Sequence, residues 1–172
     1  MYNPLAMLPL HLVCQLIDRN NLNVTNVGLV LDRTLVPKVA TELPDGYGVF
    51  RGFGVAYKFY KNRLPWDKAQ DICIADGGSL AVIDSFQKME VATVLMETGA
   101  YPWVGFHRIF DNTEWIDVKT GLPTVAIPWR SDSGVFDLAR KCVAMYPDRT
   151  GLYAERCNIL YPFICEVPIF KE

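Results

Sequence analysis

The chain has 172 residues, of which 51% are hydrophobic and 12% aromatic, enough to bury the core of one domain with a short appendage and without a structural metal. Its 17 basic and 19 acidic side chains leave a formal net charge of −2, so no general positive field would attract nucleic acid or an acidic membrane surface. No apolar run reaches the length of about 18 residues that a transmembrane helix requires, so we expect no membrane-spanning segment.

Residues 1–45 are predicted to form an N-terminal arm that precedes a domain at 46–172, because Pro44, Asp45 and Gly46 form a strong turn signal. Four leucines in the arm recur at the spacing of one helix face, whereas NVGLVLDRTLV is typical of a strand. These leucines are Leu5, Leu8, Leu12 and Leu16. Their apolar face either packs on the protein's own domain or supports self-association or docking to a partner.

The arm also carries signals about the cellular compartment. The first twenty residues lack a basic n-region and a small-x-small cleavage site, so we do not expect them to act as a secretory leader. The triplet Asn23-Val24-Thr25 predicts glycosylation at Asn23, which agrees with passage through the secretory pathway. Cys14 is either a buried apolar side chain or a link between two chains.

After the boundary, VAYKFYKNR alternates as a strand does, and Pro65 stands where the first turn of a helix tolerates proline. Trp66, Ala69 and Cys73 then fall on one stripe of the predicted helix, which would direct the cysteine into the core. Gly77-Gly78 is predicted to end this helix.

Residues 79–83 are predicted to form a short strand, followed by a second helix. Asp84 and Gln87 resemble a capping box at its start, and the helix is expected to continue to about Met96, before Gly99. Further strands are predicted at 103–106, around 142–146 and at 161–166, with long polar loops between them. Two early helices followed by strands and loops indicate an α+β fold.

The remaining four cysteines are Cys73, Cys142, Cys157 and Cys165. None belongs to a C-x-x-C pair of the kind used by zinc sites and thioredoxin-like redox centres. We therefore expect disulfide bonds, which require an oxidising compartment, and predict that the protein is secreted.

The order WDKAQDIC, GGSLAVIDS, WVGF, EWIDVKTG and YPFICE, from about Gly46 to Pro168, resembles a C-type lectin-like domain. The resemblance implies two helices, antiparallel sheets, a long loop region, and two disulfides that pair Cys73 with Cys165 and Cys142 with Cys157. The PDGY opening and the stretch WVGFHRIFDNTEW are similar to insect haemolymph lipopolysaccharide-binding lectins and immulectins. This similarity implies a binding protein of innate immunity that recognises microbial glycans or lipopolysaccharide.

Members of this family normally bind sugar through calcium, with Glu-Pro-Asn or Gln-Pro-Asp after the last loop tryptophan and Trp-Asn-Asp before the third family cysteine. Here those places hold Asp132-Ser133-Gly134 and Tyr153-Ala154-Glu155. We therefore assign no metal ligands and expect no calcium-bridged sugar site of the usual kind. An altered calcium site is the alternative, since several oxygen ligands remain; these are Asp132, Ser133, Asp137, Asp148 and Glu155.

Binding without calcium would have to use other side chains of this region. Our candidates for ligand binding are Arg130, Asp132, Ser133, Asp137, Arg149, Tyr153 and Glu155. The basic residues Arg130, Arg140, Lys141, Arg149 and Arg156 could pair with phosphates, or form ion pairs with the interleaved acidic residues. The aromatic residues Tyr101, Phe106, Phe110, Phe136, Tyr146 and Tyr153 could stack on sugar rings, although we expect only one or two to be exposed.

We do not expect an enzyme. The only histidines are His11 and His107, and the sequence contains no H-E-x-x-H zinc motif, G-x-S-x-G elbow or phosphate-binding loop. His107 is expected to be a surface or capping histidine rather than a general base. The alternative function is an extracellular structural or interaction protein that binds protein partners and assembles through residues 1–45.

Overall fold

The computed structural model describes residues 43–110 and 113–169. This part of the chain contains the helices α2 (Trp66–Ala75) and α3 (Phe86–Leu95), and a short 3₁₀ turn at Arg51–Phe53. The eight strands are β1 (Gly48–Phe50), β2 (Val55–Leu64), β3 (Ser79–Leu80), β4 (Trp103–His107), β5 (Ile116–Asp117), β6 (Cys142–Met145), β7 (Leu152–Glu155) and β8 (Tyr161–Pro168). Nearly all of the arm 1–45, with Cys14 and Asn23, lies outside the described residues, so the predictions made for it stay predictions.

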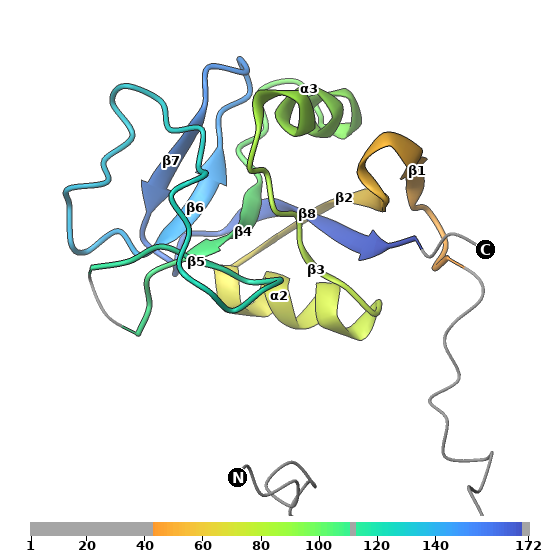
Figure 1. The fold of residues 1–172 in the computed structure, drawn as a ribbon, viewed down its shortest axis with the longest axis horizontal. Helices are drawn as coiled ribbons and strands as arrows, with labels where there is room; N and C mark the ends of the chain where they lie inside the picture. The colour runs from red at the N-terminus through yellow and green to blue at the C-terminus, as the bar shows by residue number, and fades with distance from the viewer. Residues whose placement is uncertain (1–42, 111–112, 170–172) are drawn as a thin grey trace, which may run out of the picture. The chain divides into compact units, whose positions relative to one another are not determined.

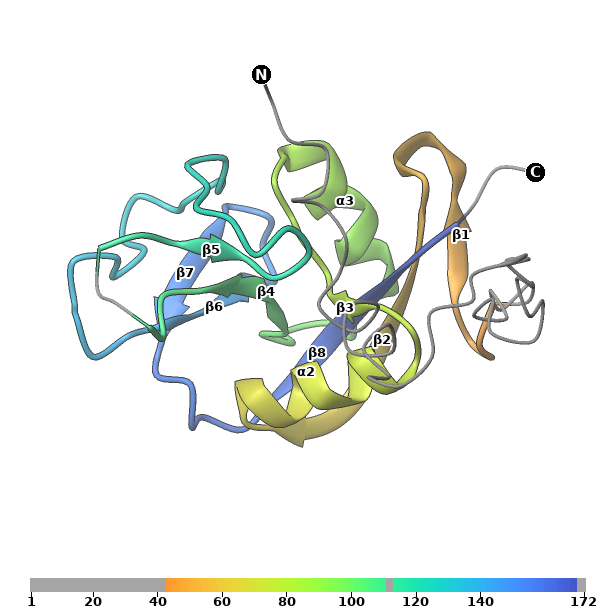
Figure 2. The same cartoon turned by 60° about the horizontal axis from the view of Figure 1, so that its bottom comes forward.

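The strands form one sheet in the order β1-β2-β8-β4-β6-β7, with β3 added to β8 and β5 added to β4. Neighbouring strands are antiparallel except β4 and β8, which are parallel at Trp103 and Phe163. The two helices lie on opposite sides of the β2–β8 pair, and β4, β6 and β7 lie with the long loops at one end (Figures 1 and 2). The predicted α+β fold with two helices is confirmed.

Helix α2 buries the stripe that the sequence predicts, namely Trp66, Ala69 and Cys73. This stripe faces the core because residues three and seven positions apart share one side of a helix. Cys73 forms a disulfide with Cys165 of β8, with their Cα atoms 5.2 Å apart, and Cys142 pairs with Cys157 at 5.1 Å. Both predicted disulfides are confirmed.

Helix α3 begins one residue later than predicted. Its N-cap is Ser85, whose Oγ accepts a hydrogen bond from the Lys88 backbone N–H at 3.4 Å. The carboxylate of Asp84 instead forms an ion pair with the Lys88 ammonium group at 2.7 Å. Asp84 and Ser85 are both good N-cap residue types, and Ser85, whose backbone is extended, takes the role here. The predicted Asp84–Gln87 capping box was therefore wrong.

Gly105 of the WVGF segment lies where three backbone segments meet. Its N–H donates to the carbonyl of Ala81 at 2.8 Å, and its carbonyl accepts the Val118 N–H at 3.1 Å. A Cβ atom at this position would lie 2.4 Å from the Leu80 carbonyl oxygen and 2.7 Å from Val118 Cγ2. Only glycine permits this approach, which joins β4 to the residues after β3 and to the residue after β5.

We predict that Gly105→Ala lowers the free energy of unfolding by about 2–3 kcal/mol, because the added methyl group forces backbone segments apart. The measurement is urea unfolding followed by tryptophan fluorescence. Gly52→Ala is the matched control, since a Cβ atom at Gly52 meets nothing within 4 Å. Equal unfolding midpoints for both variants would contradict the tight packing at Gly105.

Candidate functional site

Arg130 joins the long loop to the hairpin formed by β6 and β7. Its backbone N–H donates to the Leu152 carbonyl at 2.9 Å, and the Leu152 N–H donates to the Pro128 carbonyl at 2.9 Å. Gly151 makes this approach possible, because a Cβ atom there would lie 2.6 Å from the Arg130 nitrogen. The loop backbone is therefore hydrogen-bonded to the start of β7.

The Arg130 guanidinium lies between two carboxylates. Its Nε is 2.6 Å from Asp132 Oδ1, its Nη1 is 3.7 Å from Asp148 Oδ2, and its Cζ lies 3.9 Å from the centre of the Tyr146 ring. Asp148 also accepts hydrogen bonds from the hydroxyl and backbone N–H of Thr150. These bonds, with a smaller contribution from Arg130, lower the pKa of Asp148 below its ordinary value and keep it ionised.

A second arginine holds the next part of the loop. Arg108 is buried, and its guanidinium stacks on the Trp115 ring. It donates through Nη2 to the Asp137 carbonyl at 2.6 Å and through Nε to the Arg140 carbonyl at 3.1 Å. The Asp137 carboxylate accepts the Ala139 N–H at 2.9 Å and Arg140 Nε at 3.2 Å. The Ala139 N–H, followed by Arg140, lowers the pKa of Asp137. Sequence reasoning missed Arg108, since its partners are carbonyl groups about thirty residues away in the chain.

Two of the predicted ligand-binding side chains are buried instead. Ser133 is 5% exposed. Its backbone N–H donates to the Arg130 carbonyl at 3.1 Å, and its backbone carbonyl accepts the Ala154 N–H at 2.7 Å. Tyr153 packs against Tyr146 with ring centres 4.8 Å apart and is only 7% exposed. Neither side chain is presented to a ligand in this arrangement.

The other predicted residues lie at the surface but do not form one cluster. Arg130 and Asp132 are in direct contact, and Asp137 pairs with Arg140 on a separate turn of the loop. Arg149 is exposed in the turn of the β6–β7 hairpin, where its φ of 62° is left-handed. The Glu155 carboxylate accepts the N–H of the adjacent Arg156 at 2.8 Å.

The carboxylates of this region face arginines or backbone N–H groups rather than one another. Within the described residues, no group of three or more His, Cys, Asp and Glu side chains is arranged to hold a metal ion. The oxygen ligands that an altered calcium site would need, Asp132, Asp137, Asp148 and Glu155, are therefore not gathered around a common centre.

The candidate aromatic side chains differ in exposure. Phe106 is fully buried, whereas Phe110 is 88% and Phe136 95% exposed, and Tyr101 is intermediate at 37%. The two phenylalanines lie on different parts of the long loop region. They are the members of the predicted aromatic set that are most available to a ligand or partner.

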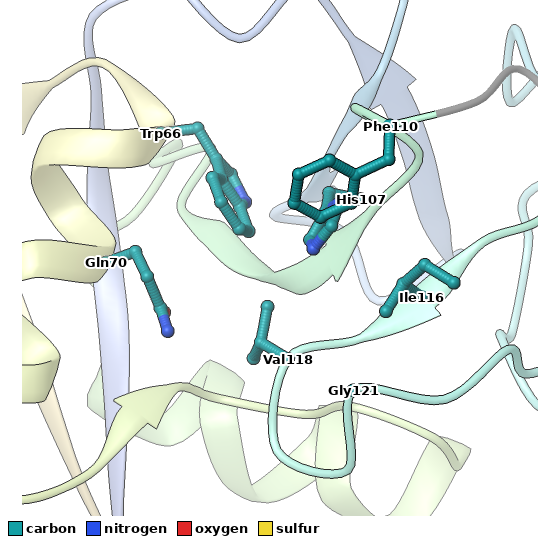
Figure 3. Close-up of a pocket in the computed structure, with 7 residues that line it drawn as sticks. All are labelled: Trp66, Gln70, His107, Phe110, Ile116, Val118 and Gly121. Atoms are coloured by element: carbon teal, nitrogen blue, oxygen red, sulfur yellow. The ribbon is translucent and has the colours of Figure 1, made fainter.

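A separate pocket of about 300 Å³ opens between α2, β4 and β5 (Figure 3). It is lined by Trp66, Gln70, His107, Phe110, Ile116, Val118 and Gly121. His107 is only 8% exposed, and its Nδ1 accepts the Ile109 N–H at 3.3 Å. It is thus a buried capping histidine, not a surface one. No sequence motif indicated this pocket, because its residues come from α2, β4, β5 and the loops beside them, which meet only in the folded chain.

The model of the Lectin C-type domain family matches residues 62–167, which hold both disulfides. The match leaves out β1, the 3₁₀ turn, most of β2 and the last residue of β8. The chain belongs to the C-type lectin domain family. The resemblance inferred from the cysteine and tryptophan order is confirmed. Domains of this family are binding modules, so the expectation that the chain is not an enzyme agrees with its membership.

This C-type lectin domain is similar to proteins from several sources. It is 32% identical over 146 residues to the hemolymph lipopolysaccharide-binding protein of Periplaneta americana, a match that covers 77% of this chain and 56% of that protein. The mouse scavenger receptor C-type lectin carbohydrate-recognition domain superposes with a TM-score of 0.66 at 17% identity, covering 75% of this chain and 98% of that one. A Ca²⁺-dependent type II antifreeze protein in its Ca²⁺-free form gives 0.64 at 24% identity, covering 72% and 98%. The two structures show the shared fold.

In the part of this chain that the structure describes, no helix is long and apolar enough to cross a membrane.

Burial of His107 gives a prediction for stability against pH. Desolvation lowers the pKa of His107 in the folded state, so below about pH 6.5 the unfolded chain takes up a proton that the folded chain does not. The free energy of unfolding should therefore fall as the pH drops from 7 to 5. In His107→Gln the fall should be shallower, as measured by urea unfolding at each pH; parallel curves would show that His107 does not contribute.

Proposed function

We propose that this C-type lectin domain belongs to an extracellular pattern-recognition protein that binds a microbial surface glycan or lipopolysaccharide without a calcium bridge. The similarity to the hemolymph lipopolysaccharide-binding protein of Periplaneta americana supports the ligand class. The two disulfides support an oxidising, extracellular setting. This chain spans little more than half of that relative, so the activity of a whole protein of this kind is part of the proposal.

The observation that carries the proposal is the Arg130 ion pairing. A calcium-bridged sugar site needs six to eight oxygen ligands around one cation. Here the carboxylates of Asp132 and Asp148 flank the guanidinium of Arg130, so an arginine supplies the positive charge between them. Recognition in this chain would then depend on hydrogen bonds, apolar contacts and exposed arginines.

Arg149 is the arginine best placed to contact an anionic ligand. It is exposed in the β6–β7 turn, and among the described residues it has no ion-pair partner. Arg130 and Arg140, by contrast, already pair with carboxylates. A phosphate group of lipopolysaccharide could accept charge-assisted hydrogen bonds from the Arg149 guanidinium.

A second candidate function is binding to a protein partner, and the exposed apolar side chains of the loops favour it. Val125 is 100% exposed and Phe136 95%, while Leu122 and Leu138 are also exposed. Apolar and aromatic side chains at the surface are typical of protein interfaces. This function would also accommodate assembly through residues 1–45.

For the calcium-free mechanism, we predict the same melting temperature and the same retention on immobilised lipopolysaccharide in calcium and in chelator. The reason is that the Arg130 guanidinium contacts the carboxylates of Asp132 and Asp148 and neutralises their charge. Thermal unfolding and a pull-down in both buffers provide the measurements. Loss of binding or a clear drop in melting temperature in chelator would indicate a calcium site.

For the contact with phosphate, we predict that Arg149→Ala weakens lipopolysaccharide binding by roughly fivefold, which corresponds to about 1 kcal/mol. Arg63→Ala is the matched control, because Arg63 is also exposed but lies on β2. If wild type does not bind lipopolysaccharide or glycan at all, the proposed ligand class is wrong. A stable oligomer formed through residues 1–45 would then favour the interaction protein.

A further inference from the structure

The pocket between α2, β4 and β5 has features of a binding site separate from the Arg130 region. It has a volume of about 300 Å³, in the range of small-molecule sites, and shares no lining residue with the Arg130 ion pairs. Figure 3 shows the side chains of Trp66, Gln70, His107 and Val118 arranged around a common space.

His107 supplies one hydrogen-bond donor to this space. Because its Nδ1 accepts the Ile109 N–H, the proton of the neutral imidazole is on Nε2. Figure 3 shows a nitrogen of this ring turned toward the space bordered by Gln70 and Val118. Desolvation lowers the pKa of His107, which keeps the ring neutral at physiological pH.

Gln70 supplies the second donor. Its Oε1 accepts the Leu80 N–H at 2.8 Å, which fixes the orientation of the amide. The amide NH₂ is on the opposite branch, and it has no hydrogen-bond partner within the described part of the chain. The pocket thus presents two N–H donors from side chains held by backbone hydrogen bonds.

The remaining walls are apolar. The Trp66 indole N–H is already donated to the Val104 carbonyl at 2.9 Å, so Trp66 presents only its ring. Phe110 packs against His107 with ring centres 5.5 Å apart, and Ile116 and Val118 lie opposite. Among the residues that the structure describes, no lysine, arginine, aspartate or glutamate lines this pocket.

These features select a neutral ligand with an acceptor oxygen and an apolar end. A carboxylate or phosphate would lack a cation here, and a sugar bearing only hydroxyl groups would lack acceptors for its protons. An acyl amide fits both requirements, since its carbonyl accepts two N–H groups and its alkyl part can lie against aromatic rings.

We propose that this pocket binds the acyl amide of an N-acylated amino sugar, with its carbonyl on His107 Nε2 and the Gln70 amide and its alkyl part against Trp66 and Val118. The sugar as ligand rests on the proposed function. The acyl group has two sources, the N-acetyl group of a glycan or the long N-acyl chain of a glycolipid. A neighbouring pocket of about 320 Å³ shares Gln70 and Val118 with this one, and the longer chain would lie there along Ile74 and Pro168, beside the Lys119–Glu166 ion pair.

The test is a titration of the full chain with N-acetylglucosamine, glucosamine and glucose, followed by the NMR signal of the Trp66 indole N–H. We expect a dissociation constant on the order of millimolar for N-acetylglucosamine, and binding at least about tenfold weaker for the other two sugars. An N-octanoyl glucosamine that binds more tightly than the N-acetyl sugar would identify the glycolipid as the source. Equal affinity would identify the glycan.

Three variants assign the binding to the pocket. Gln70→Glu retains the acceptor for the Leu80 N–H but removes the donor, and His107→Phe retains an aromatic ring without Nε2; each should weaken binding about tenfold. Phe110→Ala removes an exposed wall and should weaken binding without affecting folding, whereas Phe136→Ala, equally exposed on another part of the loop, should not. Phe110→Ala decides the result if a buried variant fails to fold.

Equal binding of glucose and N-acetylglucosamine, no binding of any acylated sugar, or unchanged affinity in all three pocket variants would overturn this assignment. The lipopolysaccharide pull-down is an independent measurement. Retention of lipopolysaccharide without binding of acylated sugars would refute the pocket alone. Binding of N-acetylglucosamine that these variants weaken, without retention of lipopolysaccharide, would refute the proposed lipopolysaccharide ligand but not the pocket.

Discussion

The pairing of β2 with β8 is the interaction on which the rest of the domain depends. These two strands come from near opposite ends of the domain's sequence, and β8 also pairs with β3 and with β4. The Cys73–Cys165 disulfide links α2 to the same strand. Long-range pairing costs chain entropy, and a disulfide between residues 92 positions apart reduces that cost by restricting the unfolded chain. Without β8, β4 would lose its parallel partner, and helix α2 would lose both its disulfide and one of the strands on which it packs.

The same strand positions both regions that we connect with binding. Strand β4 lies beside β8 at Trp103 and ends at His107, so the pocket is formed where β4 meets α2 and β5. On its other side β4 pairs with β6, which carries the hairpin that holds Arg130. Both regions are therefore built on hydrogen-bonded elements, whereas the exposed apolar side chains Val125 and Phe136 lie on the loops.

The sequence predicted what depends on local patterns. The stripe of Trp66, Ala69 and Cys73 follows from helical periodicity, and the family resemblance identified both disulfides. Strand β7 was not predicted, although it is as long as its partner β6, because its residues were compared only with the family's calcium-binding motif. The burial of His107, and the place of Asp148 beside Arg130, depend on residues brought together from distant parts of the chain. No local pattern encodes such proximity, so the pocket and the arginine-centred ion pairs required the structure.

The use of an arginine between loop carboxylates has a thermodynamic consequence. A bound ion stabilises a loop by a free energy that rises with the logarithm of the ion concentration relative to its dissociation constant, so a calcium-held loop loosens when calcium is scarce. Arg130 is covalently part of the chain, and its backbone is also hydrogen-bonded to Leu152, so this loop keeps its attachment to the hairpin whatever the calcium concentration. An arginine cannot replace calcium in binding sugar, however, because a guanidinium has no vacant coordination position that sugar hydroxyls could fill.

Under the proposed function, ligand recognition must then depend on groups other than those that hold the loop. The exposed Arg149 and the donors of the pocket meet that condition, since neither Arg149 nor the free N–H groups of His107 and Gln70 are used to hold the fold together.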